Sequence, residues 1–300
     1  MKPKSTLRSF LLAATTVLAG HAGGALIAYE GFNPAPSSTN IVGTGSGSGF
    51  SGNWVDSAGS GTITRTNSNA SITAYPSNVT FAAPAGGVAT NTGNYTDNSV
   101  TRTLSTTLDL SSNGSFYLSF LYNDSAPANN TANREVTVFL GSTTQRLHVG
   151  LNYGFTGQTD SVAITRNNAT NEPFTSATQR TMGTTDFFGQ TGSATLFIVA
   201  EFLTQTVGND TINLKACSFT PGTGTVDLSP SAVSWNVTQS FNGSGTLDRL
   251  GIYMEAQGGQ NPEIDEIRLG QTWLDVTSVP EPRAALLGGL GLLMLLRRRR

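Results

Sequence analysis

Three carboxylates stand close together near the end of the chain, at Glu263, Asp265 and Glu266. Two carboxyl groups about 5 to 5.5 Å apart, a nucleophile and an acid/base, are what retaining cleavage of a glycosidic bond requires. In a strand, alternate side chains share a face, so we expect Glu263 and Asp265 on one face with Ile267, and Glu266 on the other. Only a bulge would bring the third carboxylate into register. The pattern favours a structural strand, with sugar hydrolysis as the alternative.

Histidine and cysteine offer few sites. His21 and His148 are the only two histidines, which excludes a His-rich metal site. His148 lies in an alternating run without a Gly-x-Ser-x-Gly elbow, so it is expected to be an ordinary strand residue rather than part of a Ser-His-Asp triad. Cys217 is the single cysteine, so no intramolecular disulfide forms. We expect it to be a small buried side chain, the alternative being a reactive or intermolecularly paired thiol.

Two further kinds of ligand site are open. Loop Asp and Asn side chains could bind calcium, although no EF-hand spacing is present and turn chemistry explains the same residues; they are Asn123-Asp124, Asn129-Asn130 and Asn209-Asp210. Aromatic rings could stack on the apolar faces of sugars, although alternating strand aromatics are usually core residues; they are Trp54, Trp235, Trp273, Tyr75, Tyr95, Tyr122 and Tyr153. The sequence therefore predicts no cofactor and no metal, with calcium left open.

The first 22 residues have the layout of a secretory signal peptide. Basic residues Lys2, Lys4 and Arg8 precede a short apolar segment, and small residues then fit cleavage after Ala22, with Ala25 as the second choice. We therefore predict an exported protein whose signal peptide is 1–22.

The opposite end carries an apolar segment between two charged motifs. Pro280-Glu281-Pro282 leads into the uncharged run 284–296, and the chain stops at Arg297, Arg298, Arg299 and Arg300. A helix over that run is about 20 Å long, short of the roughly 30 Å hydrocarbon core, which makes it a marginal membrane anchor. The terminal arginines are expected to stay cytoplasmic, with everything before Pro280 outside.

These elements in this order resemble the PEP-CTERM sorting signal of Gram-negative bacteria. The resemblance covers 279–300, with the motif at 280–282, the transmembrane helix at 284–296 and the Arg cluster at 297–300. It implies recognition by an exosortase, a membrane-embedded cysteine transpeptidase, and passage through an inner-membrane-anchored intermediate to the cell surface or extracellular matrix. It also implies a host that makes exopolysaccharide, which makes that polymer a candidate partner.

The region 23–278 reads as one all-β domain. Charged residues make up 12% of the chain, and short alternating runs are separated by Gly, Asn, Asp and Ser clusters, as in an antiparallel β-sandwich. The clearest predicted strands are 116–122, 135–140, 146–151, 194–203, 211–219, 234–241, 247–255 and 263–269, among about fourteen. The Gly-rich segment 43–51 is expected to be a loop inside the domain.

Charge argues against nucleic acid as a partner. The predicted end segments hold 8 of the 17 basic residues and 1 of the 19 acidic residues, so the remainder carries 9 and 18, a net charge of about −9. Binding to phosphates requires clustered Lys and Arg, which this region lacks.

The domain also resembles the concanavalin A-like and LamG-like jelly rolls. The residues that carry the resemblance are 28–32 (AYEGF), 47–54 (GSGFSGNW) and 264–270 (IDEIRLG) with Thr272-Trp273. It implies two antiparallel sheets packed face to face. The leading hypothesis is a non-enzymatic, exosortase-sorted surface or matrix protein associated with exopolysaccharide or biofilm. The alternatives are a lectin-like carbohydrate-binding module and a jelly-roll glycoside hydrolase, whose laminarinase-type Glu-x-Asp-x-Glu signature residues 263–266 match incompletely.

Overall fold

The computed structural model describes residues 26–32, 39–59, 62–67, 74–79, 84, 87–91, 96–124, 134–153, 161–167, 180–185, 187, 194–228, 234–256 and 262–277. The predicted signal peptide, the predicted sorting tail 279–300, Tyr95 and Asn129-Asn130 lie outside these residues. Within them, no helix is long and apolar enough to cross a membrane.

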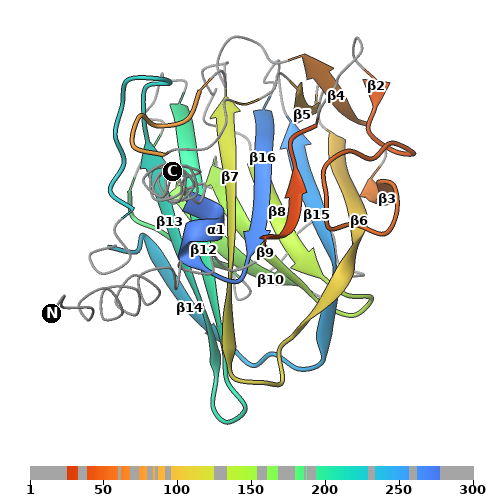
Figure 1. Ribbon diagram of the computed structural model, residues 1–300, viewed down its shortest axis with the longest axis vertical. Helices are drawn as coiled ribbons and strands as arrows, with labels where there is room; N and C mark the ends of the chain where they lie inside the picture. The colour runs from red at the N-terminus through yellow and green to blue at the C-terminus, as the bar shows by residue number, and fades with distance from the viewer. Residues whose placement is uncertain are drawn as a thin grey trace, which may run out of the picture.

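The described strands form two antiparallel sheets (Figure 1), which confirms the predicted all-β sandwich. The nine-stranded sheet has the order β14 (Val237–Phe241), β13 (Asp210–Ser218), β12 (Ala194–Thr204), β7 (Gly114–Asp124), β16 (Pro262–Gly270), β5 (Gly87–Asn91), β4 (Ile63–Asn67) and β2 (Thr39–Asn40), with β1 (Leu26–Glu30) also paired to β16. The eight clearest predicted strands are confirmed as β7, β8 (Arg134–Gly141), β9 (Arg146–Tyr153), β12, β13, β14, β15 (Thr246–Ala256) and β16.

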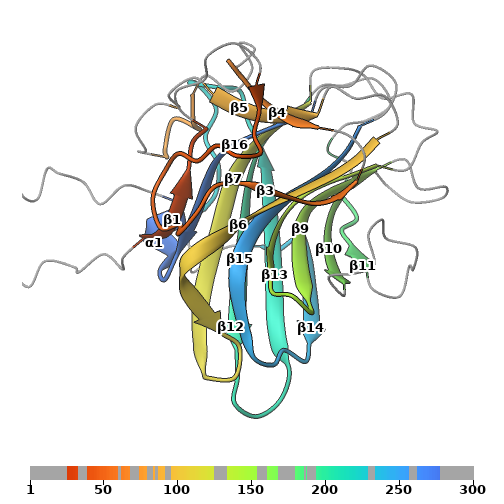
Figure 2. The same cartoon turned by 90° about the vertical axis from the view of Figure 1, so that its right-hand side faces the viewer.

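The second sheet has seven strands. Its order is β11 (Arg180–Met182), β10 (Ser161–Asn167), β9 (Arg146–Tyr153), β8 (Arg134–Gly141), β15 (Thr246–Ala256), β6 (Thr96–Asp109) and β3 (Val55–Gly59). Figure 2 shows this sheet running from β6 through β15 and β9 to β10 and β11. The chain reaches β15 about a hundred residues after β8, yet places it beside β8, so neighbours in this sheet come from distant parts of the sequence.

Alternation along each strand divides its side chains between two faces. In β8, Val136, Val138 and Leu140 point toward the other sheet and join the main core between the two layers. We call the face of each sheet that is directed at the other sheet the inner face, and the opposite one the outer face. The main core is apolar because both inner faces supply alternate Val, Leu, Ile and Phe residues.

The outer face of the nine-stranded sheet carries a second, smaller core. Leu121, Phe197 and Val199 on the strands are covered by Tyr75, by Phe219 and Val226, and by the helix α1 (Trp273–Thr277). The helix packs against β7 and β16. This sheet is therefore apolar on both sides over much of its width.

Strand β16 contains a bulge that the sequence analysis did not predict. Asp265 pairs with Leu121 and Arg268 with Ser119, so three steps along β16 match two along β7. Glu266, within the bulge, has a φ of 55°, in the left-handed region that favours glycine. Before the bulge, one edge of β16 pairs with β5. After the bulge, the same edge pairs with β1.

The bulge corrects one expectation about facing. Ile264 and Ile267 both lie in the main core, so Ile267 does not share a face with Glu263 and Asp265 as predicted. Asp265 pairs with Leu121, a residue of the smaller core, and therefore lies on the outer face of the nine-stranded sheet.

The Gly-rich segment forms a loop bound to the first strand. Ser48 and Tyr29 exchange both backbone hydrogen bonds at 2.9 Å. Gly47, with a φ of 75°, lies so close to the Tyr29 carbonyl that a Cβ there would collide with it. A glycine at this position is thus required by both conformation and space.

Candidate functional site

The outer face of the seven-stranded sheet carries a group of buried polar side chains. We call it the polar face and define it by Glu135, Thr137, Phe139, His148, Asn152, Ser161, Thr165 and Tyr253. Each of these residues is at most 1% exposed. Polar side chains on an outer face usually reach water, so their withdrawal from solvent sets these residues apart, and we take them as the candidate site.

Strand register arranges these residues in three rows across the sheet. Phe139, His148 and Thr165 are directly paired in the first row. Tyr253, Thr137, Gly150 and Ala163 form the second row, with small residues at one end. Glu135, Asn152 and Ser161 form the third. Residues directly opposite have Cβ atoms about 4.5 to 5.5 Å apart, so each row is a continuous set of neighbours.

Unused hydrogen-bonding groups gather in the third row. Neither Nδ2 nor Oδ1 of Asn152 has a partner, and Ser161 Oγ has none. Both side chains are fully buried. A buried polar group without a partner costs on the order of 1–3 kcal/mol, and the large majority in folded proteins are paired. Two such residues directly opposite each other place several unused hydrogen-bonding atoms at one point of this face.

An aromatic stack occupies the first and second rows. The Phe139 ring covers Gly251, where any Cβ would overlap the ring. The His148 ring stacks on Phe139 with centroids 4.5 Å apart, and Tyr253 meets His148 edge-on at 6.2 Å. The Arg146 guanidinium lies 4.8 Å above the Phe139 centroid. The stack combines flat apolar surface with a hydroxyl and an imidazole.

His148 is held in its neutral form. Its Nδ1 lies 2.9 Å from Thr137 Oγ1. Burial, assisted by the nearby Arg146 charge, holds the pKa of His148 well below its ordinary value of 6.5. A neutral imidazole can both donate and accept a hydrogen bond.

Glu135 is the buried carboxyl of the face. It contacts Arg180 Nη2 at 3.2 Å and accepts a hydrogen bond from Thr165 Oγ1 at 3.3 Å. Burial raises the pKa of Glu135 from 4.5 to about 8, although Arg180 and Thr165 act in the opposite direction. At neutral pH this carboxyl is therefore largely protonated and can donate a hydrogen bond.

The three carboxylates singled out in the sequence lie away from the polar face, on β16 of the other sheet. The bulge directs Glu266 to Tyr29 and Tyr75, whose hydroxyls donate to it at 2.8 and 2.5 Å, and Arg268 Nη2 lies 3.0 Å away. Burial and the neighbouring Glu266 raise the pKa of Tyr75 well above 10. Asp265 Oδ1 accepts the Glu266 backbone N–H at 2.7 Å. Glu266 is thus occupied in fixing the bulge.

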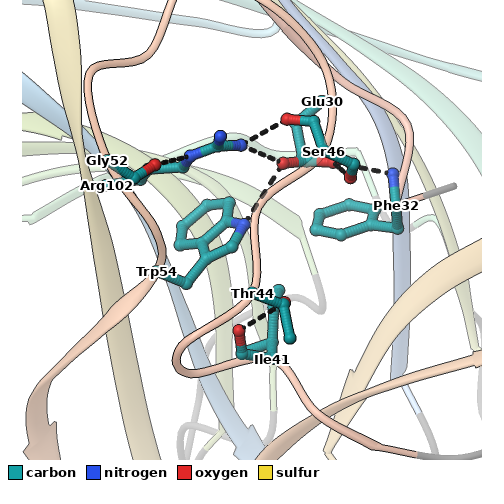
Figure 3. A network of polar contacts seen from close by, with 8 residues as sticks. All are labelled: Glu30, Phe32, Ile41, Thr44, Ser46, Gly52, Trp54 and Arg102. Atoms are coloured by element: carbon teal, nitrogen blue, oxygen red, sulfur yellow. Dashed lines mark hydrogen bonds and ion pairs between the residues drawn. The ribbon is translucent and has the colours of Figure 1, made fainter.

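A second buried charge network crosses the sandwich near β1 (Figure 3). Glu30 pairs with Arg102 at 2.6 Å and accepts hydrogen bonds from Trp54 Nε1 at 3.2 Å, the Phe32 backbone N–H at 2.9 Å and Ser46 Oγ. The Glu30 carboxylate and the Trp54 indole are therefore hydrogen-bonded to each other inside the protein. Trp54 is 1% exposed and serves the core, not a surface platform.

The other aromatic candidates also mostly serve the core. Tyr122 is fully buried, Trp273 donates from Nε1 to the Leu228 carbonyl at 2.8 Å, and Tyr75 belongs to the smaller core. Trp235 is partly exposed and meets Trp273 edge-on at 5.8 Å. Tyr153 ends β9, and its side chain is outside the described set.

The remaining candidate residues from the sequence have ordinary structural roles. Both carboxyl oxygens of Asp210 accept backbone hydrogen bonds, from Gln205 at 2.8 Å and Gly243 at 3.1 Å, as turn chemistry predicts. Asn123 and Asp124 end strand β7 rather than forming a loop. Cys217 is half-buried, and burial raises the pKa of its thiol. Among the described residues, no group of three or more His, Cys, Asp or Glu side chains is arranged to hold a metal ion.

Sequence reasoning missed most of the polar face. It considered His148 but not Glu135, Asn152, Ser161 or Tyr253. One signal was available: in 146–152 (RLHVGLN), polar residues alternate with Leu147, Val149 and Leu151 in a strand too apolar to lie at an edge. The pairing of β9 with β10 and of β8 with β15 was not readable from local patterns.

No family model matches the chain, and no curated protein matches it. Three solved structures similar to it share little sequence. Botulinum neurotoxin type C, whose cell entry is dependent upon interaction with two ganglioside molecules, aligns with a TM-score of 0.39 and 11% identity over 79% of this chain. The alignment covers 47% of the neurotoxin chain, so this chain spans about half of its length.

The other two alignments cover most of the similar structure. Lectin II from Ulex europaeus aligns with a TM-score of 0.39 and 10% identity, over 61% of this chain and 86% of the lectin. The endo-β-1,4-glucuronan lyase from Trichoderma reesei aligns with a TM-score of 0.38 and 11% identity, over 74% of this chain and 90% of the lyase. The chain is an antiparallel two-sheet β-sandwich, and lectin-like jelly rolls are among the structures similar to it.

Proposed function

We propose that this chain is a non-enzymatic carbohydrate-binding protein whose ligand sits on the polar face of the seven-stranded sheet. The observation that carries the proposal is the third row, where buried Asn152 and Ser161 lie opposite each other with unused hydrogen-bonding atoms. An amide and a hydroxyl together offer donors and acceptors, which suits the paired hydroxyls of a sugar.

The aromatic stack supplies the second requirement of sugar binding. Phe139 and His148 present stacked rings, and Tyr253 adds a ring with a polar tip. Sugars have apolar C–H faces that pack on rings and hydroxyl edges that need hydrogen bonds. Because these groups are withdrawn from water, each hydrogen bond made there is stronger than at an open surface.

The experiment is a glycan array and polysaccharide pull-down with the purified full chain, scoring both retained and released sugar. We expect specific, saturable retention without release. Asn152→Ala should weaken this retention about tenfold or more, because the sugar hydroxyl that Asn152 would bind is then left without a hydrogen-bond partner. Asn213→Ala, on the outer face of the other sheet, is the matched control and should bind normally. Retention unaffected by Asn152→Ala would contradict the proposed face, and released sugar would contradict the non-enzymatic assignment.

We further propose that the domain is delivered to the outside of the cell. The support is the sequence of the two ends: the signal-peptide layout of 1–22 and the tail 279–300, with an exosortase and, before processing, the membrane as partners. The delivered protein would then meet exopolysaccharide as its ligand. Cell fractionation tests this: replacing Pro280, Glu281 and Pro282 by Ala should leave the chain in the inner membrane, and unchanged surface delivery would contradict it.

A further inference from the structure

The outer face of the nine-stranded sheet carries a group of partly exposed apolar side chains. Tyr117 and Trp235 each meet Trp273 edge-on, with ring centroids 5.9 and 5.8 Å apart. Leu228, also partly exposed, packs with them at the border of the smaller core. Single apolar residues at a surface are ordinary, whereas a contiguous group of them is typical of an interaction site.

Helix α1 extends this group. Leu274, which follows Trp273, is 49% exposed, and Leu26 of β1 is 37% exposed. Leu26 is paired with Gly270, whose backbone lies against Asp275 of the helix. Of the four exposed large hydrophobic side chains in the described part of the chain, two therefore lie on or beside α1. We define the apolar patch as Tyr117, Leu228, Trp235, Trp273 and Leu274.

The chain leaves the sandwich beside the apolar patch. Ser119 Oγ of β7 donates to the Val276 carbonyl at 2.6 Å, and Trp273 Nε1 donates to the Leu228 carbonyl at 2.8 Å. Thr277 Oγ1 donates to the Trp273 carbonyl at 2.8 Å. The helix is thus held on the sheet as far as its last residue, Thr277.

The sequence after α1 limits how far the apolar patch can lie from a membrane. Six residues, 278–283, separate Thr277 from the uncharged run 284–296. The seven steps from Thr277 to Ala284 span at most about 25 Å when fully extended. A compact domain of this length is about 45 Å across. With 284–296 in a bilayer, the side of the sandwich that carries α1 is therefore the side nearest to that bilayer.

We propose that the apolar patch rests on the surface of the bilayer that holds the segment 284–296. This inference rests on the membrane-anchored stage of the proposed function. Trp and Tyr rings are enriched at membrane–water interfaces, because their apolar bodies and polar tips suit the level of the headgroups. Leu274 contacts the boundary of the acyl chains. The charged side chains that border the patch stay in the headgroup layer; they are Lys215, Glu201 and Asp227.

This contact sets the direction of both sheets relative to the membrane. Figure 2 shows α1 and β1 on one side of the sandwich and β9, β10 and β11 on the other. The outer face of the nine-stranded sheet is then directed at the bilayer, and the polar face of the seven-stranded sheet is directed away from it. A polymer outside the cell meets the polar face while the chain is still anchored.

The test is tryptophan fluorescence of the full chain in vesicles of phosphatidylethanolamine and phosphatidylglycerol, with and without bromine on the acyl chains. Bromine quenches a tryptophan only at close contact. Trp54 is 1% exposed and lies in the main core, so quenching reports on the patch. We expect brominated vesicles to lower the fluorescence, and Trp235→Phe should remove most of this loss.

Leu274→Glu and Val55→Glu provide a matched pair of variants. The two positions are 49% and 54% exposed, so both variants should fold, but Val55 lies on β3 of the seven-stranded sheet. Leu274→Glu should reduce the quenching by about half or more, because a carboxylate is excluded from apolar lipid. Val55→Glu should be quenched as the wild type is.

Flotation of the vesicles measures anchoring separately. Chains that float with the vesicles but show no quenching overturn the contact and leave the anchored stage intact. Equal quenching in Leu274→Glu and Val55→Glu has the same meaning. Chains that do not float overturn the anchored stage and the contact together. None of these results bears on sugar binding at the polar face, which the glycan array tests.

Discussion

At the residue scale, a buried charge makes stability sensitive to the loss of its partner. Arg102 and Glu30 join the two sheets through an ion pair whose carboxylate also accepts hydrogen bonds from Trp54 and the Phe32 backbone. Such a pair adds little net stability compared with an apolar replacement, yet removal of one partner leaves the other charged and desolvated.

Replacement of Arg102 by Met should therefore lower the free energy of unfolding by about 3–5 kcal/mol. Arg249→Met is the matched control on the same sheet, because its pair with Asp248 is partly exposed and is worth about 0–1 kcal/mol. Urea denaturation of both variants measures the difference. Equal losses of unfolding free energy in the two variants would mean that burial of an ion pair does not determine the cost of breaking it.

Glu135 makes stability depend on pH. Its pKa is about 8 in the folded protein and 4.5 as a free side chain, so the folded state binds the proton more tightly. The stability that this provides is fully present below pH 4.5 and is lost as pH rises through about 8. Glu135→Gln, which cannot titrate, should lack this contribution, so across that interval its free energy of unfolding should fall less, or rise more, than that of the wild type.

Asp248→Asn provides the contrast. Its hydrogen bond with Arg249 lowers the pKa of Asp248 below 3.8, so its contribution to stability is present above that value and is lost as pH falls. This variant should keep the wild-type decline between pH 4.5 and 8. If the decline seen in the wild type persists in Glu135→Gln, a group other than Glu135 causes it.

At the scale of strands, glycine sets how closely the aromatic stack approaches the sheet. The Phe139 ring rests on Gly251, with no room for a Cβ. Gly251→Ala should displace the ring and cost about 1–3 kcal/mol through overpacking, and it should weaken sugar binding because His148 stacks on the same ring. Gly52→Ala, where the added Cβ meets nothing within 4 Å, is the control. Thermal unfolding and the pull-down together measure both effects.

Strands were predictable where their pattern is local. Alternation and turn residues in 116–122 and 146–151 identify β7 and β9, because these signals need no partner strand. The bulge in β16 was not predictable. Glu266 adopts its left-handed conformation with support from Tyr29 and Tyr75, which lie 237 and 191 residues away in sequence. The residue types and their spacing within 262–270 do not indicate these partners.

For the whole molecule, composition and strand spacing were enough to predict two packed antiparallel sheets. The candidate site was harder, because it exists only when β8, β9, β10 and β15 are aligned in one register. Neither Asn152 nor Ser161 is unusual alone, and each would suit a solvated outer face. Only their common burial and their unpaired atoms mark the site.

The first and last described strands lie side by side, since Leu26 of β1 pairs with Gly270 of β16. A short linker could therefore join the end of α1 to β1, because chain ends that meet at the surface tolerate reconnection. New ends could be opened in the turn 142–145 between β8 and β9, whose residues are partly or fully exposed and lie outside both strands. Such a circular permutant would keep every strand pair, so the order in which the strands are synthesised is separable from the sandwich that they build.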